Sequence, residues 1–317
     1  DADKADFSVI YDNLNERISV IEARALSKDV GREYSGFYSG DFLPIGNHKH
    51  PFNLSLWKEI GLPYYAQSIA IYGDYFVCFY GNNTSSGSLW RLSNATKIAD
   101  ITFSYGSFSK PHGNVMNFGN EFADGNTDLP LLYVSQWDGE GGCLVYDIRL
   151  DGTCTLVQTI MVSNMTQDKF GSALGDWVID NATNSIYSVK YHNNSATPST
   201  TNYDNVCRFA LPKLVDGSAI VLTDSDILES FTMPFTPIGQ DKKISNGMLF
   251  IAAGNPSYTD SQKIYAVDLG RKAMVSIFNL ASYGDEPEGL EILDDGLILG
   301  YGYQPQKFFL ITTVSQN

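Results

Sequence analysis

YFVCFY at residues 75–80 and SLWRLS at residues 88–93 are two short apolar strands joined by a polar turn, and this pair recurs along the chain. The second strand of the pair returns, at intervals of 55, 62, 58 and 44 residues, at 143–148 (CLVYDI), 205–210 (NVCRFA), 263–268 (KIYAVD) and 307–312 (KFFLIT). An apolar strand precedes each of them, and in four of the five cases a further strand follows. The sequence is therefore built from five similar units.

A repeat of about 45–60 residues with four strands in each unit is typical of a β-propeller blade. One small twisted sheet cannot cover both of its faces, whereas sheets packed around an axis cover each other and leave only short edges. Abundant Gly, Tyr and Phe, with 28, 19 and 18 copies, suit short strands and many turns. We predict an all-β fold, a β-propeller of five four-stranded blades over residues 31–317, behind a short N-terminal α-helix.

The fifth unit lacks its last strand, because only Val314–Asn317 follow the strand that begins at Lys307. The missing outer strand must come from elsewhere in the chain. Tyr34–Phe42, which precedes the first complete unit, is the expected donor. The N- and C-terminal segments would then share one blade and close the ring.

Residues 4–26 carry the one long stretch with helical periodicity, with apolar residues at steps of three or four. Phe7, Leu14 and Ile21 are one heptad apart, but Arg17 and Arg24 fall on the other core position, so a coiled coil here would be short. Two interpretations of residues 1–30 stay open. The helix lies on the flank of the propeller, or it is a stalk that joins three copies of the chain into a homotrimer.

Two resemblances follow from these stretches. Residues 2–26 (ADKADFSVIYDNLNERISVIEARAL) resemble the coiled-coil linkers of phage tail fibres and related trimeric surface proteins. Residues 64–313 resemble propellers encoded by gut Bacteroidota and their phages, through HGNVMNFGNEF, LPLLYVSQWDGEGGCLVYDI and EPEGLEILDDGLILG. The second resemblance implies the fold alone.

The composition excludes several classes of protein. A net charge of −15 and a sequence pI near 4.5 leave no basic face for nucleic acid or for an anionic membrane. No apolar run approaches the ~18 residues that span a bilayer. The four cysteines have no spacing typical of zinc, so we interpret them as buried thiols. An extracellular, cell-surface or virion location fits this acidity.

The first strand of each blade faces the central channel, and its polar residues are the candidates for a site. The first turns of three blades, at 66–75, 239–248 and 288–297, share one internal spacing. The other two blades begin less regularly. Six residues should then lie near one mouth of the channel: Gln67, His112, Asn114, Asp176, Gln240 and Glu288.

Glu288 is the strongest single candidate, because Pro287 and Gly289 constrain the backbone on either side of it. Similar Pro-Glu-Gly starts occur in calcium-dependent propeller hydrolases, where the glutamate is a ligand. That resemblance implies a calcium site for which Glu288, Asn114 and Asp176 are the candidate ligands. Apart from this resemblance, we expect no cofactor. An enzyme built here would use Glu288, Asp176 and His112.

Against an enzyme, Gln67 and Gln240 stand where the acids of five-bladed glycosidases would be expected. Sugar binding instead needs aromatic platforms beside planar polar groups, and Trp137 in a glycine-rich loop is one candidate. We therefore favour a non-enzymatic recognition module that binds a surface glycan or receptor. A metal-assisted hydrolase or lyase acting on a carbohydrate, and a structural component that docks to other proteins, remain the alternatives.

Overall fold

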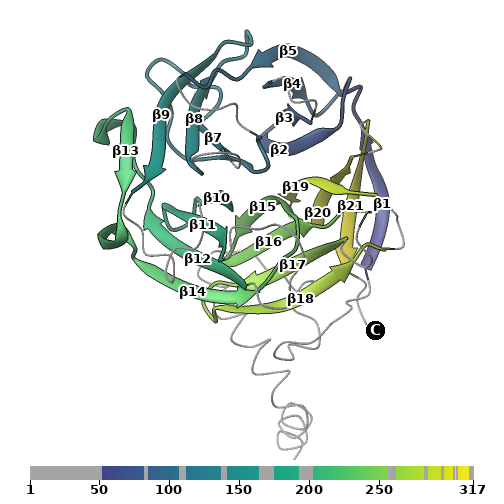
Figure 1. Ribbon diagram of the computed structural model, residues 1–317. Coiled ribbons are helices and arrows are strands. Elements are labelled where there is room, and N and C mark those ends of the chain that lie inside the picture. The colour runs from purple at the N-terminus through teal and green to yellow at the C-terminus, as the bar shows by residue number, and fades with distance from the viewer. Residues whose placement is uncertain are drawn as a thin grey trace, which may run out of the picture.

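Five antiparallel sheets form a ring in the computed structural model of the chain (Figure 1). The structure describes residues 52–81, 85–106, 112–136, 141–163, 175–192, 203–255, 257, 262–281, 285–293, 296–302, 304 and 306–313. The predicted N-terminal helix and coiled coil of residues 4–26 lie outside these described residues. The five-bladed, all-β propeller that the repeat predicted is confirmed.

The blades follow one another in chain order, each beginning with its inner strand. Blade 1 holds β2 (Ala66–Tyr72), β3 (Tyr75–Tyr80), β4 (Ser86–Arg91) and β5 (Thr96–Thr102). Blade 2 holds β6 (Met116–Phe118), β7 (Leu132–Ser135), β8 (Cys143–Ile148) and β9 (Cys154–Val162). Blade 3 holds β10 (Gly175–Asp180), β11 (Ser185–Tyr191), β12 (Tyr203–Ala210) and β14 (Glu229–Pro234). Blade 4 holds β15 (Gly239–Ser245), β16 (Met248–Ala253), β17 (Lys263–Asp268) and β18 (Ala273–Asn279).

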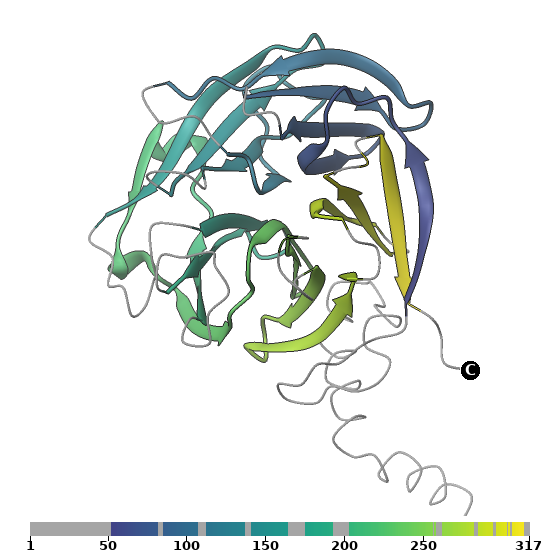
Figure 2. The same ribbon diagram turned by 45° about the vertical axis from the view of Figure 1, so that its right-hand side comes forward.

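Blade 5 combines strands from both ends of the described chain. It holds β19 (Pro287–Leu293), β20 (Gly296–Tyr301), β21 (Lys307–Thr313) and β1 (Phe52–Glu59). β1 runs antiparallel to β21 along the outer edge of the ring, with Phe52 opposite Thr313 and Glu59 opposite Lys307 (Figure 2). The outer strand of this blade is thus Phe52–Glu59 rather than Tyr34–Phe42, which lies outside the described residues.

A fifth strand on blade 2 was not expected from the repeat. The connection between β12 and β14 contains two single-turn helices, η1 (Leu214–Asp216) and η2 (Asp224–Asp226), and the strand β13 (Ala219–Leu222). β13 pairs in parallel with β9 of the preceding blade. The neighbouring blades 2 and 3 are therefore joined by backbone hydrogen bonds as well as by packing.

The hydrophobic core lies between the blades. Buried apolar residues of the described chain form five clusters, and each cluster joins two neighbouring blades. Phe76 of blade 1 and Phe308 of blade 5, for example, pack edge to face with ring centroids 5.1 Å apart. Since every blade buries both faces, the five inner strands are held in fixed positions around the channel. That rigidity is what positions the site.

The four cysteines are free, and three of them are buried. Burial raises the pKa of Cys78 and of Cys207 to about 12, so these thiols stay protonated and unreactive. None of the helices among the described residues is long and apolar enough to cross a membrane.

Candidate functional site

Three inner strands begin with the same irregularity. A β-bulge interrupts β2 at Gln67, β15 between Gly239 and Lys242, and β19 between Pro287 and Leu290. A bulge inserts one residue that has no partner across the ladder, and it turns the local side chains away from the regular pleat. The strand register makes residues 66–75, 239–248 and 287–296 equivalent, so the spacing predicted for blade 5, 288–297, is one residue too late.

The bulges bring side chains of different blades into one hydrogen-bonded group at the mouth of the channel. The Gln67 Nε2 group lies 3.3 Å from Asn114 Oδ1, 3.3 Å from Gln240 Oε1 and 2.6 Å from Glu288 Oε2. All four side chains are buried. We call Gln67, Asn114, Gln240 and Glu288 the mouth cluster. Four residues predicted from the sequence thus meet, one from each of four blades.

Electrostatics favour a protonated Glu288. Burial raises the pKa of Glu288 well above its usual value, and the neighbouring carboxyls of Glu286, Asp241 and Asp285 raise it further. Glu286 also binds the mouth cluster, because Gln240 Nε2 donates to Glu286 Oε1 at 2.8 Å. A protonated Glu288 accepts the hydrogen bond of Gln67 on one oxygen and has an O–H to donate from the other.

Asp176, the fifth predicted residue, has a different partner. Its Oδ2 atom forms an ion pair with Lys242 Nζ, and the two side chains are 1% and 2% exposed. The same ammonium donates to Gln240 O at 3.0 Å, so the pair adjoins the mouth cluster. Burial raises the pKa of Asp176, and Lys242 partly offsets this effect. The pair therefore places a buried positive charge beside the carboxylate.

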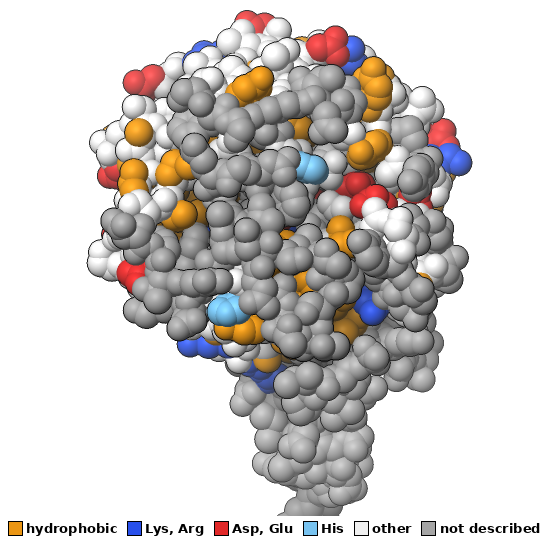
Figure 3. Space-filling model, in the orientation of Figure 1, with side chains coloured by type: hydrophobic (Ala, Val, Ile, Leu, Met, Phe, Trp, Pro, Cys, Tyr) orange, Lys and Arg blue, Asp and Glu red, His pale blue; other side chains and the backbone are white. Residues whose placement is uncertain are grey.

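The two remaining predicted residues stand differently. His112 is half-buried, and a positive charge on its ring would lower the pKa of the carboxyls of Asp176 and Glu286. On the face of the ring seen in Figure 3, a histidine and acidic side chains lie close together near the centre. Trp137 lies outside the described residues.

Lysines next to the cluster were missed by the sequence analysis. Lys190 on β11 is fully buried, donates to Gly141 O at 2.9 Å and lies 5.1 Å from the centroid of the Trp177 ring. Burial lowers the pKa of Lys190 to about 8, although the nearby Asp176 opposes this shift. One signal could have revealed this chemistry: the run Asp241-Lys242-Lys243 lies in an inner strand, where charges must be paired.

The described residues do not fit the calcium site implied by the sequence. Asn114 and Glu288 both bind Gln67, and Asp176 already faces the ammonium of Lys242. Within the described part of the chain, no group of three or more His, Cys, Asp or Glu side chains could hold a metal ion. A cation at Asp176 would meet the positive charge of Lys242 at contact distance.

A buried carboxyl near the site makes stability depend on pH. Burial raises the pKa of Asp204 to about 7, even though Thr236 donates to it from its backbone at 3.0 Å and from its hydroxyl. An unfolded chain releases this proton near pH ~3.9. The folded protein binds the proton more tightly, so this carboxyl's contribution to the free energy of unfolding is fully present below about pH 4 and is lost as the pH rises to about 7.

We expect Asp204→Asn to flatten this decrease. The measurement is the urea midpoint at about pH 4 and about pH 7 in the natural chain and in the variant. An unchanged decrease would show that a different group carries the pH dependence. Asp241 would then be the first candidate for the group that carries the pH dependence, because burial raises its pKa to about 7 as well.

Comparison with solved structures agrees with the fold. A glutaminyl cyclase from Myxococcus xanthus superposes with a TM-score of 0.51 at 10% identity, covering 85% of this chain and 100% of that one. A virginiamycin B lyase from Staphylococcus aureus superposes with a TM-score of 0.41 at 11% identity, covering 83% and 100%. No protein-family model and no curated protein matches the sequence. The class of the chain is that of the propellers, and the likeness to the glutaminyl cyclase extends to the fold alone.

Proposed function

We propose that this propeller is a non-enzymatic recognition module, extracellular or virion-associated, which binds a surface glycan at the channel mouth. The observation that carries the proposal is the convergence of Gln67, Asn114, Gln240 and Glu288 from four blades into one hydrogen-bonded group. Amide and carboxyl groups in fixed positions are the partners that orient a polar ligand in a pocket. A sugar that offers hydroxyl or N-acetyl groups could replace the contacts that these side chains make with each other.

The test is a glycan array probed with the full chain, followed by calorimetry on each ligand found. Gln240→Leu removes one amide of the mouth cluster and is expected to weaken binding at least tenfold, because a buried polar group of the ligand would lose its partner. Val215→Ala, an exposed change in η1 and outside the inner strands, is the matched control and should leave that affinity unchanged. Absence of any ligand, or equal affinity in the Gln240→Leu variant, would refute the proposal.

A second candidate is a carbohydrate hydrolase or lyase, and the raised pKa of Glu288 is the observation that favours it. A protonated carboxyl can act as a general acid, with His112 or Asp176 as the other participant. A metal-assisted form would need a cation held by Glu288 and Asn114 alone, because Asp176 pairs with Lys242.

Glu288→Gln separates the two candidates. The amide has the shape of the protonated acid and retains an acceptor for Gln67, so a recognition module should keep its affinity within about threefold. A hydrolase would lose the proton donor and with it a factor of about 10²–10⁴ in rate. Product release by the natural chain that Glu288→Gln abolishes, with binding retained, would replace the recognition proposal by the enzyme.

We also propose that residues 4–26 join three chains, which would present three channel mouths to one surface. Light-scattering mass of the full chain and of a chain without residues 1–30 tests this. A trimer that becomes a monomer supports the stalk. A monomer in both cases refutes the stalk. The third possibility, a structural component that docks to other proteins, would then be tested by a search for proteins that bind the chain.

A further inference from the structure

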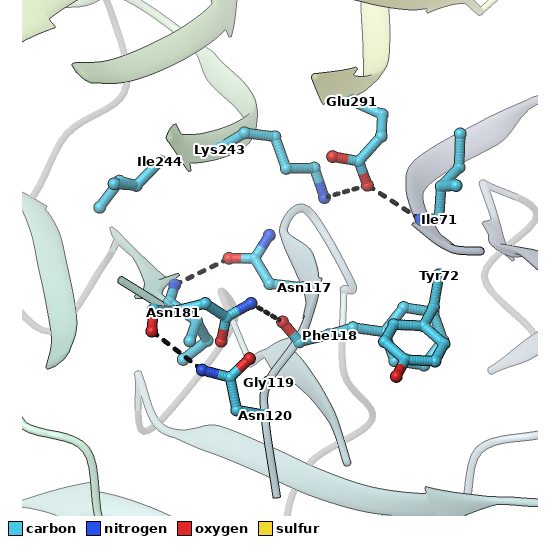
Figure 4. A pocket seen from close by; sticks show the side chains of 11 residues that line it. Ile71, Tyr72, Asn117, Phe118, Gly119, Asn120, Asn181, Lys243, Ile244 and Glu291 are labelled. Carbon is cyan, nitrogen blue, oxygen red and sulfur yellow. Dashed lines mark hydrogen bonds and ion pairs between the residues drawn. The ribbon is translucent and has the colours of Figure 1, made fainter. Parts of the chain in front are cut away.

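The opposite end of the channel holds a separate pocket. All five inner strands contribute to it where they end, through Tyr72, Asn117, Asn181, Lys243 and Glu291 among others (Figure 4). Its volume is about 140 Å³. Because the strands run in the same direction around the ring, their first residues form the mouth cluster and their last residues form this pocket.

A buried layer of charges separates the pocket from the mouth cluster. Lys243 Nζ donates to Ile69 O at 2.6 Å and to Met116 O, and it lies 3.6 Å from Asp241 and 3.8 Å from Glu291. Asp241 Oδ2 in turn accepts the backbone N–H groups of Ile69 and Leu290. These contacts cross the channel between four blades. The two ends are therefore separate sites.

Several groups that face this pocket are acceptors of hydrogen bonds with open positions. Asn120 Nδ2 donates to Asn181 O and Asn181 Nδ2 donates to Phe118 O, both at 2.9 Å. Neither side-chain oxygen accepts a hydrogen bond from the described residues. The carboxylate of Glu291 accepts the backbone N–H groups of Ile71 and Ile292, which leaves part of its four acceptor positions open.

Lys243 offers no donor to compensate for these acceptors. Its ammonium donates to two carbonyl oxygens and lies 3.6 and 3.8 Å from two carboxylates, and the residue is 4% exposed. Asn117 is likewise engaged, since its oxygen accepts Ile179 N at 2.8 Å and its nitrogen donates to two carbonyl oxygens. A ligand that fits must therefore bring donors for these oxygens, while its own oxygens can accept from an asparagine N–H or from the Tyr72 hydroxyl.

One wall of the pocket is aromatic. Tyr72 and Phe118 line it, with ring centroids 5.9 Å apart, and Phe122 packs against Tyr72 from outside the pocket at 6.1 Å. Tyr72 is 39% exposed. Figure 4 shows the tyrosine and the phenylalanine on one side of the pocket, with the asparagines and the Lys243–Glu291 pair on the others. An apolar ring face would find a partner in this wall.

We propose that this second pocket binds a small, uncharged, hydroxyl-rich ring such as the pyranose of a sugar. Its hydroxyl groups donate to Asn120, Asn181 and Glu291, and its apolar face contacts Tyr72. The charges of Lys243, Glu291 and Asp241 nearly balance. An anion is disfavoured because it would lie beside carboxylates, and a cation is disfavoured because it would lie beside the ammonium of Lys243. This site is independent of the one proposed at the mouth cluster.

The experiment is saturation-transfer NMR on the full chain with methyl glycosides of glucose, galactose and mannose, and with tetramethylammonium as the cationic probe. We expect transfer to at least one glycoside, lost or weakened at least tenfold in Tyr72→Ala and in Asn120→Ala. Both positions are exposed, so the variants should fold. Tyr64→Ala changes a tyrosine of similar exposure, 49%, outside the pocket and should leave the signal intact.

Three results would overturn the proposal: no transfer to any glycoside, transfer that both pocket variants retain, or transfer to tetramethylammonium in place of the glycosides. Gln240→Leu distinguishes the two sites. Binding that this variant abolishes and that Tyr72→Ala retains belongs to the mouth cluster and counts against the second pocket.

Discussion

Replacing Lys242 with methionine is expected to lower the free energy of unfolding by about 3–5 kcal/mol, because it leaves the carboxylate of Asp176 buried without its partner. Both side chains are almost completely buried, and the second carboxylate oxygen of Asp176 has no hydrogen-bond partner in the described structure. Lysine contributes the only charge that contacts this carboxylate directly among the described ion pairs. Methionine preserves most of the volume, so the loss would measure the charge rather than a cavity.

The test measures the free energy of unfolding in urea for the natural chain, for Lys242→Met and for a double variant. The double variant Asp176→Asn with Lys242→Met removes both charges and should regain most of the lost stability, since a buried pair is costly mainly when one member is left alone. The cost of Lys242→Met should also shrink at low pH, where Asp176 takes up a proton. A single variant that costs less than about 1 kcal/mol at neutral pH would contradict the buried pair.

Deleting residues 1–59 is expected to lower the free energy of unfolding by about 5 kcal/mol or more. That is a large part of the 5–15 kcal/mol typical of a folded domain. The deletion removes β1, which faces seven residues of β21, and each lost hydrogen bond is worth about 1 kcal/mol net. Leu54 and Trp57 also pack on the clusters at either side of blade 5. The exposed edge of β21 should in addition promote aggregation.

The chain without residues 1–30 is the matched control, because it keeps β1. It should unfold at the same urea concentration as the full chain, after any difference in oligomeric state is taken into account. A synthetic peptide of residues 50–62, added to the chain without residues 1–59, should restore stability in proportion to its concentration. Equal midpoints for both truncations would show that β1 contributes little to closing the ring.

The fold could be predicted because the strand pattern repeats. A single apolar strand is ambiguous, but five similar units at similar intervals have few other solutions, and β8 and β17 match the predicted ranges at both ends. The identity of the closing strand was harder to predict. Nothing local distinguishes 34–42 from 52–59, and the choice depends on pairing with a strand some 250 residues away. β13 was not predicted for the same reason, because it pairs with β9 and three strands of blade 3 lie between the two in the sequence.

The candidate site could be predicted because the first strand of each blade faces the channel. The spacing seen in the sequence places blade 5 one residue too late, with Glu288 at the first place and Gln67 and Gln240 at the second. The strand register makes the three residues equivalent, and the structure brings them together with Asn114. The pairing of Asp176 with Lys242 was not visible, because a lysine three positions after Gly239 is expected to reach solvent. The bulge after Gly239 changes which residues point inward, and a bulge has no sequence signature strong enough to assign in one blade.

The bulges also have a consequence for how such a molecule can change. Gln67 stands outside the ladder of β2 and β3, and equivalent irregular positions exist on blades 4 and 5. Exchanging these side chains for others of similar size would leave the backbone pairing of every blade as it is. Ligand preference could then drift, or be selected from a library of variants, with the architecture held constant. The side chains at these three positions on three blades can therefore vary without a change in the fold of the ring.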